Sequence, residues 1–163
     1  MLKISDSIDI KSKAVELNCN EPTSLALIPN NFEYVLEKDQ LIYSVEAPTI
    51  RSLWLQNGIQ ETRIEKTGDK FLLKEQNAFD WISPIIFISG LLISQNPELI
   101  DVALGVISNY LADYFKGIPK QVQNVKMKII EENKSGRYRK IEYEGSPEGL
   151  KDLPRIIKET FNE

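Results

Sequence analysis

The sequence of 163 residues contains no histidine and a single cysteine, Cys19. Without histidine the chain cannot form a serine–histidine triad, use a histidine general base or bind a metal through imidazole. One cysteine excludes an internal disulfide and a zinc site made of several cysteines. Catalysis or metal binding would therefore depend on carboxylates, which are scattered through polar segments without an EF-hand or similar motif. We predict no catalytic residues, no metal site and no cofactor.

Long apolar runs and an excess of positive charge are also missing. The apolar stretch that begins at Trp81 ends at Asn96-Pro97-Glu98, short of the roughly 20 residues that a membrane span needs. The net charge of −4, from 24 acidic and 20 basic residues, gives no general attraction to nucleic acid or anionic lipid. The segment 1–13 has no apolar run of the length of a secretory signal. We therefore expect a cytoplasmic protein that lies outside membranes.

What is present predicts an α+β fold in three sections that pack as one compact unit: a β-rich section (1–79), a central helical pair (80–117) and a ββα section (118–163). In the first section, short runs rich in branched and aromatic residues predict antiparallel strands in a small sandwich or open barrel. A hairpin is expected over 62–74, with its turn at Thr67-Gly68-Asp69. The predicted strands are Lys13–Leu17, Ser24–Ile28, Leu41–Glu46, Ile50–Leu55 and Gln60–Lys66.

In the second section, Asp80 is expected to cap a first helix and Asn96 a second, which ends near Gly117. Polar or small residues form one stripe of the second helix, and a broad apolar face lies opposite. Small residues would let another backbone approach closely. The helix therefore either packs only within the chain or docks a protein partner or a second copy. The partner-binding candidates are Asp101, Gly105, Ser108 and Ala112.

The third section alternates apolar and polar residues over 124–132 and 137–144, which predicts a hairpin joined by the turn 133–136. Ser146 and Pro147 then predict the start of a helix. Pro154 is expected to kink or restart this helix, with Asp152 as a second cap.

Basic residues are concentrated between Lys116 and Lys140. Lysine, arginine and an aromatic ring at a hairpin tip suit single-stranded nucleic acid. However, alternation puts Arg137 and Arg139 on the face opposite Tyr138 and Lys140, and charges on a solvated hairpin commonly discourage edge-to-edge aggregation. We therefore expect no nucleic-acid binding, and keep it as an alternative. The candidates for it are Lys134, Arg137, Tyr138, Arg139 and Lys140.

The order of elements in the C-terminal half resembles the effector-associated constant component family, small adaptor proteins of bacterial conflict systems. The residues that carry the resemblance are VALGVISNYLADYFKG (102–117) and VKMKIIEENKSGRYRKIEYEGSPEGLKDLPRIIKE (125–159). The resemblance covers residues 80–163, and what is shared is the order of an apolar helix, a hairpin and a closing helix. The β-rich first half departs from that pattern. The resemblance implies a non-catalytic component that links a sensor to an effector, and no functional residues carry over.

Together these observations predict a non-catalytic protein–protein interaction module: an adaptor, accessory subunit or inhibitor in a bacterial defence context, with a protein partner or self-association. A carboxylate- or metal-dependent hydrolase belongs to a different class, as does the single-stranded nucleic-acid binder. A deep pocket that gathers Asp and Glu side chains would favour the hydrolase.

Overall fold

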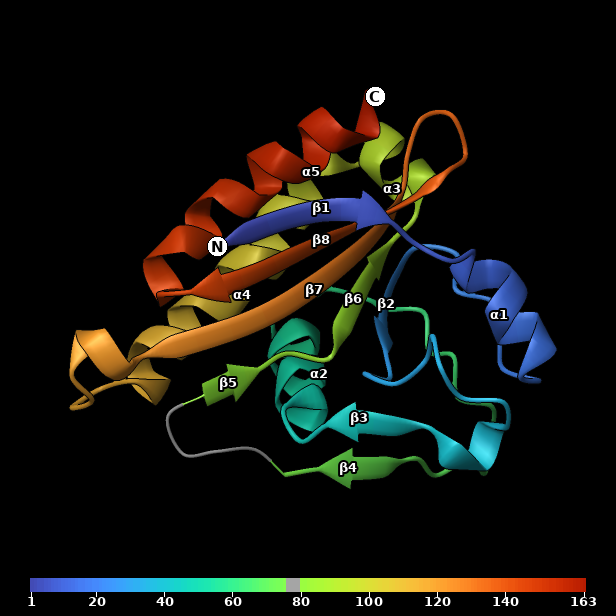
Figure 1. The fold of residues 1–163 in the computed structure, drawn as a ribbon, viewed down its shortest axis with the longest axis horizontal. Coiled ribbons are helices and arrows are strands. Elements are labelled where there is room, and N and C mark those ends of the chain that lie inside the picture. Colours follow the sequence, from blue (N-terminus) through green and yellow to red (C-terminus); the bar gives the residue numbers. More distant parts are fainter. Residues whose placement is uncertain (76–79) are drawn as a thin grey trace.

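The computed structural model describes residues 1–75 and 80–163, and it shows an α+β fold built on one mixed β-sheet with helices packed against it (Figure 1). The sheet has the strand order β1-β8-β7-β6-β2, and β5 pairs with β7 beside β6. Its strands are β1 (Leu2–Asp6), β2 (Leu25–Ile28), β5 (Asp80–Ile82), β6 (Ile85–Ile88), β7 (Asn124–Glu132) and β8 (Tyr138–Gly145). A second, parallel pair is formed by β3 (Ile42–Ser44) and β4 (Leu72–Lys74).

The helices are α1 (Ile10–Glu16), α2 (Ala47–Gln56), α3 (Gly90–Gln95), α4 (Pro97–Tyr114) and α5 (Leu153–Phe161), with short 3-10 turns η1 (Lys38–Gln40), η2 (Lys120–Val122) and η3 (Pro147–Asp152). Helices α3 and α4 connect the parallel strands β6 and β7, as a parallel pair requires a crossover. Helices α4 and α5 lie behind the sheet in Figure 1, so the opposite face of the sheet is turned toward the viewer.

The main hydrophobic core lies between the sheet and the helices α2, α4 and α5. Trp54 of α2 is 1% exposed and donates a hydrogen bond from its indole nitrogen to the carbonyl oxygen of Ala103 in α4, at 3.0 Å. A buried indole N–H needs such a partner. This contact fixes α2 against the middle of α4.

A smaller core lies on the other face of the sheet, where α1 and the segment 29–41 cover the β2–β6 end. Every residue of β2 and of β6 is buried, because both faces of these strands are covered. A strand buried on both faces reads as a continuous apolar run rather than an alternating one.

Several elements of the first section differ from the prediction. Residues 13–16 and 50–55 belong to helices α1 and α2 rather than to strands, residue 17 follows α1 in a turn, and 60–66 forms no regular strand. The expected hairpin over 62–74 is wrong, because β4 pairs with β3 in parallel. No sandwich or barrel forms among the described residues, since β2 joins the main sheet through β6.

The first central helix also begins later than expected. Residues 80–88 form β5 and β6, and α3 begins at Gly90, where the Ser89 side chain accepts a hydrogen bond from the Leu92 amide at 3.1 Å. Ser83 and Pro84 separate the two strands, because proline has no N–H to continue the ladder. The predicted helix start at Asp80 is therefore wrong. Periodicity alone does not separate a short apolar run in a helix from a buried strand, and pairing with β7 makes these residues strands.

The C-terminal predictions are confirmed. Helix α4 begins at Pro97, and β7 and β8 form the hairpin. The turn η3 gives way to α5 at Leu153, next to Pro154, with Asp152 at the N-cap position. The expected boundary between the first and second sections adjoins 76–79, outside the described residues. Strands from all three sections share one sheet. In the described part of the chain no helix has the length and apolarity to cross a membrane.

Candidate functional site

The four partner-binding candidates of α4 lie in one strip along the surface of this helix. Asp101 and Ala112 are exposed, and Gly105 and Ser108 are half-buried. A side chain added at Gly105 would meet no atom within 4 Å, so the space beside it is open. The opposite face of the helix is buried in the main core through Ile100, Ala103, Leu104, Ile107 and Leu111. The strip therefore faces outward.

Local sequence explains where this helix begins and ends. Pro97 occupies the first turn, where its missing N–H costs nothing, and Glu98 lies near the positive end of the helix dipole. The helix stops at Phe115, and Gly117 adopts a φ of +83°, a conformation that glycine accepts readily. The chain then turns away and leaves the last turn of α4 accessible.

Ser108 and Ala112 line a groove of about 540 Å³ between α4 and η3. The other walls come from the segment after α4 and from η3, and they include Lys116, Ile118, Lys120, Pro147, Glu148 and Lys151. A second groove of about 510 Å³ continues along α5, contains Asp101 and shares Lys151 with the first. The strip thus runs along a surface depression between α4 and the C-terminal segment.

The charge along the first groove is mainly positive. Lys116, Lys120 and Lys151 are exposed at its rim, and Glu148 is the one acidic residue of its lining. A backbone hydrogen bond at Glu148, together with the nearby Lys120 and Lys151, lowers the pKa of this carboxyl group. In the second groove, Asp101 pairs with Lys158 of α5 at 3.1 Å.

This arrangement can bind an anionic group beside an apolar surface. Its volume lies within the roughly 300–1,000 Å³ of ligand sites. The lysine amines donate hydrogen bonds and cannot accept them, so they select carboxylates or other anions. Ala112, Ile118 and Pro147 supply apolar contact between them.

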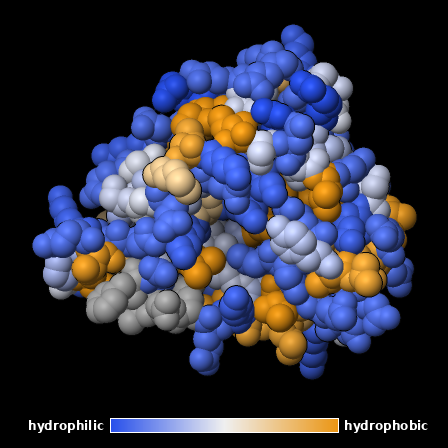
Figure 2. Space-filling model, in the orientation of Figure 1, coloured by the Kyte–Doolittle hydropathy of each residue, from blue (hydrophilic) through white to orange (hydrophobic). Residues whose placement is uncertain are grey.

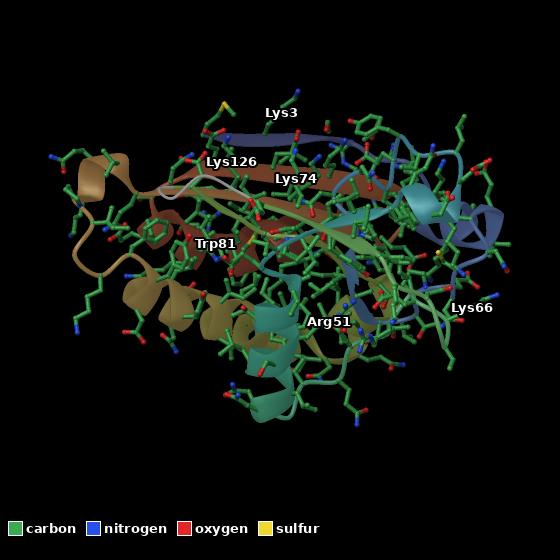
Figure 3. All side chains as sticks on the ribbon, turned by 90° about the horizontal axis from the view of Figure 1, so that it is seen from below. Lys3, Arg51, Lys66, Lys74, Trp81 and Lys126 are labelled. Carbon is green, nitrogen blue, oxygen red and sulfur yellow. The ribbon has the colours of Figure 1, made fainter. Side chains whose placement is uncertain are left out.

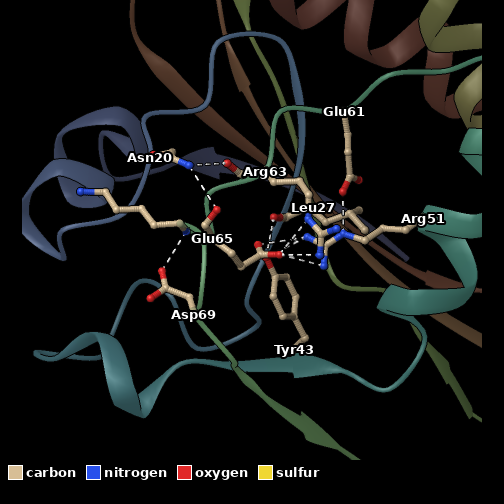
Figure 4. A network of polar contacts seen from close by, with 9 residues as sticks. Asn20, Leu27, Tyr43, Arg51, Glu61, Arg63, Glu65 and Asp69 are labelled. Carbon is tan, nitrogen blue, oxygen red and sulfur yellow. Dashed lines mark hydrogen bonds and ion pairs between the residues drawn. The ribbon is translucent and has the colours of Figure 1, made fainter.

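A second polar cluster, the Arg51 network, lies near the surface between α2, β3 and the segment 59–66 (Figure 4). The Arg51 guanidinium contacts Glu61 at 2.5 Å and Glu65 at 3.0 Å, and it stacks over the Tyr43 ring at 4.9 Å. Tyr43 donates a hydrogen bond to Glu65, and Arg63 pairs with the same carboxylate at 3.0 Å. The network holds the irregular segment 59–66 against α2.

The surroundings shift the pKa values of the two glutamates in opposite directions. Burial raises the pKa of Glu61, and the attraction of Arg51 does not fully offset it. For Glu65, burial is outweighed by the hydrogen bond from Tyr43 and by Arg51, so its pKa is lowered. Two carboxyl groups with separated pKa values are a pattern of acid–base sites. Here both are engaged by Arg51, and in the described residues no group of three or more Asp, Glu or Cys side chains is placed to hold a metal ion.

The basic hairpin candidates do not form one binding surface. Tyr138 stacks on Phe87 with ring centroids 6.2 Å apart, which leaves that face of its ring covered. Arg139 pairs with Asp6 and Lys140 pairs with Glu33, the latter at 3.0 Å. Lys134 and Arg137 are exposed at the tip. Two of the four positive charges are therefore neutralised within the chain.

The side of the molecule away from α4 and α5 is hydrophilic over most of the surface that Figure 2 shows. Figure 3 shows Lys3 and Lys126 on this face, and Trp81 on the side of the helices. A cleft of about 380 Å³ opens here, and two of its lysines have acidic partners: Lys128 lies 3.9 Å from Glu142 and Lys126 lies 3.8 Å from Asp80. Such cross-strand pairing of opposite charges is expected of a solvated sheet face.

Sequence reasoning identified the strip on α4 but not the lysines that rim the groove. In the sequence, Lys116 and Lys120 belong to the basic stretch 116–140, and Lys151 lies outside it. Their shared role depends on the packing of η3 against α4, which no local pattern predicts. Comparison with protein families, with curated proteins and with solved structures finds no match to this chain.

Proposed function

We propose that this chain is a non-catalytic protein-interaction module: an adaptor, accessory subunit or inhibitor in a bacterial conflict system. Its C-terminal half resembles an adaptor family of such systems. The observation that supports this most is the outward strip of α4, which is open at Gly105 and whose Ser108 and Ala112 line a groove with a lysine rim. Small residues allow a partner helix to approach closely, and an amphipathic helix in a groove is a common mode of protein recognition. The cytoplasm is the proposed location.

The partner segment that fits this groove is acidic and amphipathic. Lys116, Lys120 and Lys151 attract carboxylates, and apolar side chains of the partner would contact Ala112 and Ile118. Exposed charges at a rim mainly raise the rate of association and its dependence on salt. Contact with the strip then determines how long the complex lasts.

The test uses a photo-crosslinking residue at position 112, with position 70 as control, in extract of the source organism. Lys70 is exposed and lies outside the groove. We expect a specific adduct at position 112 only. The captured protein is then purified and its binding measured directly.

With the purified partner, replacing Gly105 with Leu should weaken binding at least about tenfold, because the larger side chain fills the approach path. Replacing Lys116 and Lys120 with Glu should weaken binding and reduce its salt dependence. Lys66→Glu with Lys70→Glu, a matched double reversal elsewhere, should leave binding unchanged. Equal adducts at both positions would contradict the proposal. So would an affinity for the purified partner that the groove substitutions leave unchanged.

A carboxylate-dependent hydrolase is the second candidate, and one observation favours it: the opposed pKa shifts of Glu61 and Glu65. If the Arg51 network were catalytic, Glu61→Gln would abolish hydrolysis while the fold stayed intact. We expect instead that this variant changes stability and no activity. A panel of ester, phosphoester and glycoside substrates, with the Glu61→Gln variant as the blank, makes the comparison.

A further inference from the structure

Strand β1 forms one edge of the sheet, and its outward side has no partner among the described residues. Its pairing with β8 shows which backbone groups point outward. Met1 exchanges hydrogen bonds with Glu144, and the Ser7 amide donates to the carbonyl of Tyr138. In an antiparallel ladder these directions alternate, so odd-numbered residues face β8. The N–H and C=O groups of Leu2, Ile4 and Asp6 therefore point away from the sheet.

The side chains of β1 are also unusual for an edge. On the helix-covered face, a row of aliphatic side chains crosses five strands and ends at Ile4. Its members, from β2 to β1, are Leu27, Ile86, Ile129, Ile141 and Ile4. The first four are at most 1% exposed, whereas Ile4 is 37% exposed and Leu2, on the same face, is 43% exposed. Figure 2 shows hydrophobic surface near the position of β1 in Figure 1. The core thus reaches the edge of the sheet and is left open there.

We propose that the free edge of β1 pairs with β1 of a second copy of this chain, antiparallel and centred on Ile4. A two-fold axis perpendicular to the sheet keeps each face on its own side, so residues of equal parity lie opposite one another. With Ile4 opposite its copy, Leu2 lies opposite Asp6, and these outward groups can form six backbone hydrogen bonds. The row of aliphatic residues then continues from one copy into the other.

Charge supports this register. The axis that reverses β1 reverses α5 as well, and the end of α5 lies close to β1, since Glu163 and Asp6 both contact Arg139. Arg155 and Glu159 are 61% and 64% exposed on α5 and differ in sign. Reversal brings Arg155 of one copy toward Glu159 of the other, so the surface complements itself, as an isologous contact requires. No pair of lysines is set directly opposite, because Lys3 faces Ser5 of the copy.

The first test is the mass in solution of the full chain by sedimentation velocity over a range of concentrations. We expect a reversible dimer, and Ile4→Pro should raise its dissociation constant at least about tenfold. Proline at this position removes only an outward N–H, and edge strands tolerate it. Ile4→Val retains the donor and the apolar row and should still dimerise. A monomer up to about 1 mM, or a dimer unaffected by Ile4→Pro, would overturn the proposal.

A second test reads the register and does not depend on how proline affects the fold. In a Cys19→Ala background, Ile4→Cys places two cysteines on the axis with Cα atoms about 5.5 Å apart, within disulfide range. Lys3→Cys places them on a diagonal at about 7–8 Å, beyond that range. We expect oxidation to cross-link the first variant at least about tenfold faster than the second. Equal cross-linking of the two variants, or none at position 4, would overturn the pairing.

Discussion

At the scale of single residues, Glu131 is the least expected side chain of the main sheet. It is fully buried on the helix-covered face of β7, and neither carboxyl oxygen has a hydrogen-bond partner among the described residues. Arg139 lies opposite it in β8 but is paired with Asp6 and Glu163. Burial, and then the charge of Glu163, raise the pKa of Glu131 to about 8. A buried carboxyl group without a partner is better kept neutral than charged.

This shift predicts how stability changes with pH. The pKa in the fold, about 8, lies above the ordinary value of 4.5, so the native state keeps a proton that the unfolded chain releases between these values. The contribution of Glu131 is therefore fully present at low pH and is lost as the pH rises toward 8. Glu131→Gln stays neutral and should gain more than about 1 kcal/mol relative to the wild type between pH 5 and pH 9.

Urea unfolding at pH 5, 7 and 9 measures this difference. Glu144→Gln, an exposed glutamate of β8, serves as the matched control and should follow the wild-type profile. Parallel profiles for Glu131→Gln and the wild type would show that Glu131 is charged, or compensated, in the fold.

At the scale of elements, the open space beside Gly105 means that a substitution there can stabilise α4 even where it would hinder a partner. Glycine inside a helix costs about 1 kcal/mol relative to alanine, and a side chain at this site would meet no neighbour. Gly105→Ala should therefore raise the free energy of unfolding by about 0.5–1 kcal/mol. Thermal unfolding measures the change. A lower melting temperature would mean that the strip is packed against something in the folded chain.

The two helix arginines Arg51 of α2 and Arg155 of α5 should contribute differently to the stability of the fold. Arg51 contacts two glutamates whose side chains are 12% and 10% exposed. Its loss leaves the largely buried Glu61 without its ion-pair partner, while Glu65 keeps Arg63 and Tyr43. We expect Arg51→Met to cost about 3–5 kcal/mol. Arg155→Met removes an exposed pair with Glu159 and should cost at most about 1 kcal/mol. Similar losses for the two variants in chemical denaturation would contradict the structural role of the Arg51 network.

Local patterns predicted the elements whose signals are short-range. Alternation and the turn 133–136 gave the β7–β8 hairpin, and Asn96-Pro97 gave the start of α4. Helix α2 was missed because its branched and aromatic residues favour strands, although Ala47, Ile50 and Trp54 have helical spacing. The run 85–88 reads equally as helix or buried strand until its neighbours are known. The strip on α4 follows from helical spacing, but the lysine rim needs the packing of η3.

At the scale of the whole molecule, one sheet joins strands from residue 2 to residue 145, so no section can unfold while the sheet persists. We expect a single cooperative transition. The two tryptophans report on different parts, since Trp54 lies in α2 and Trp81 in β5, and both are buried. Single-tryptophan variants, Trp54→Phe and Trp81→Phe, should give fluorescence midpoints that coincide with each other and with circular dichroism. Separate midpoints would identify an independently unfolding part.

The pairing of β1 with β8 has a consequence during protein synthesis. β1 is made before its partner in the sheet, β8, which follows more than a hundred residues later. At roughly 5–20 residues per second, the ribosome needs on the order of ten seconds to reach β8. Throughout this interval β1 lacks the ladder with β8 that the finished protein provides, so both of its sides are unpaired. The nascent chain thus carries an unpaired apolar strand, a target for chaperones and for other nascent copies on the same messenger RNA.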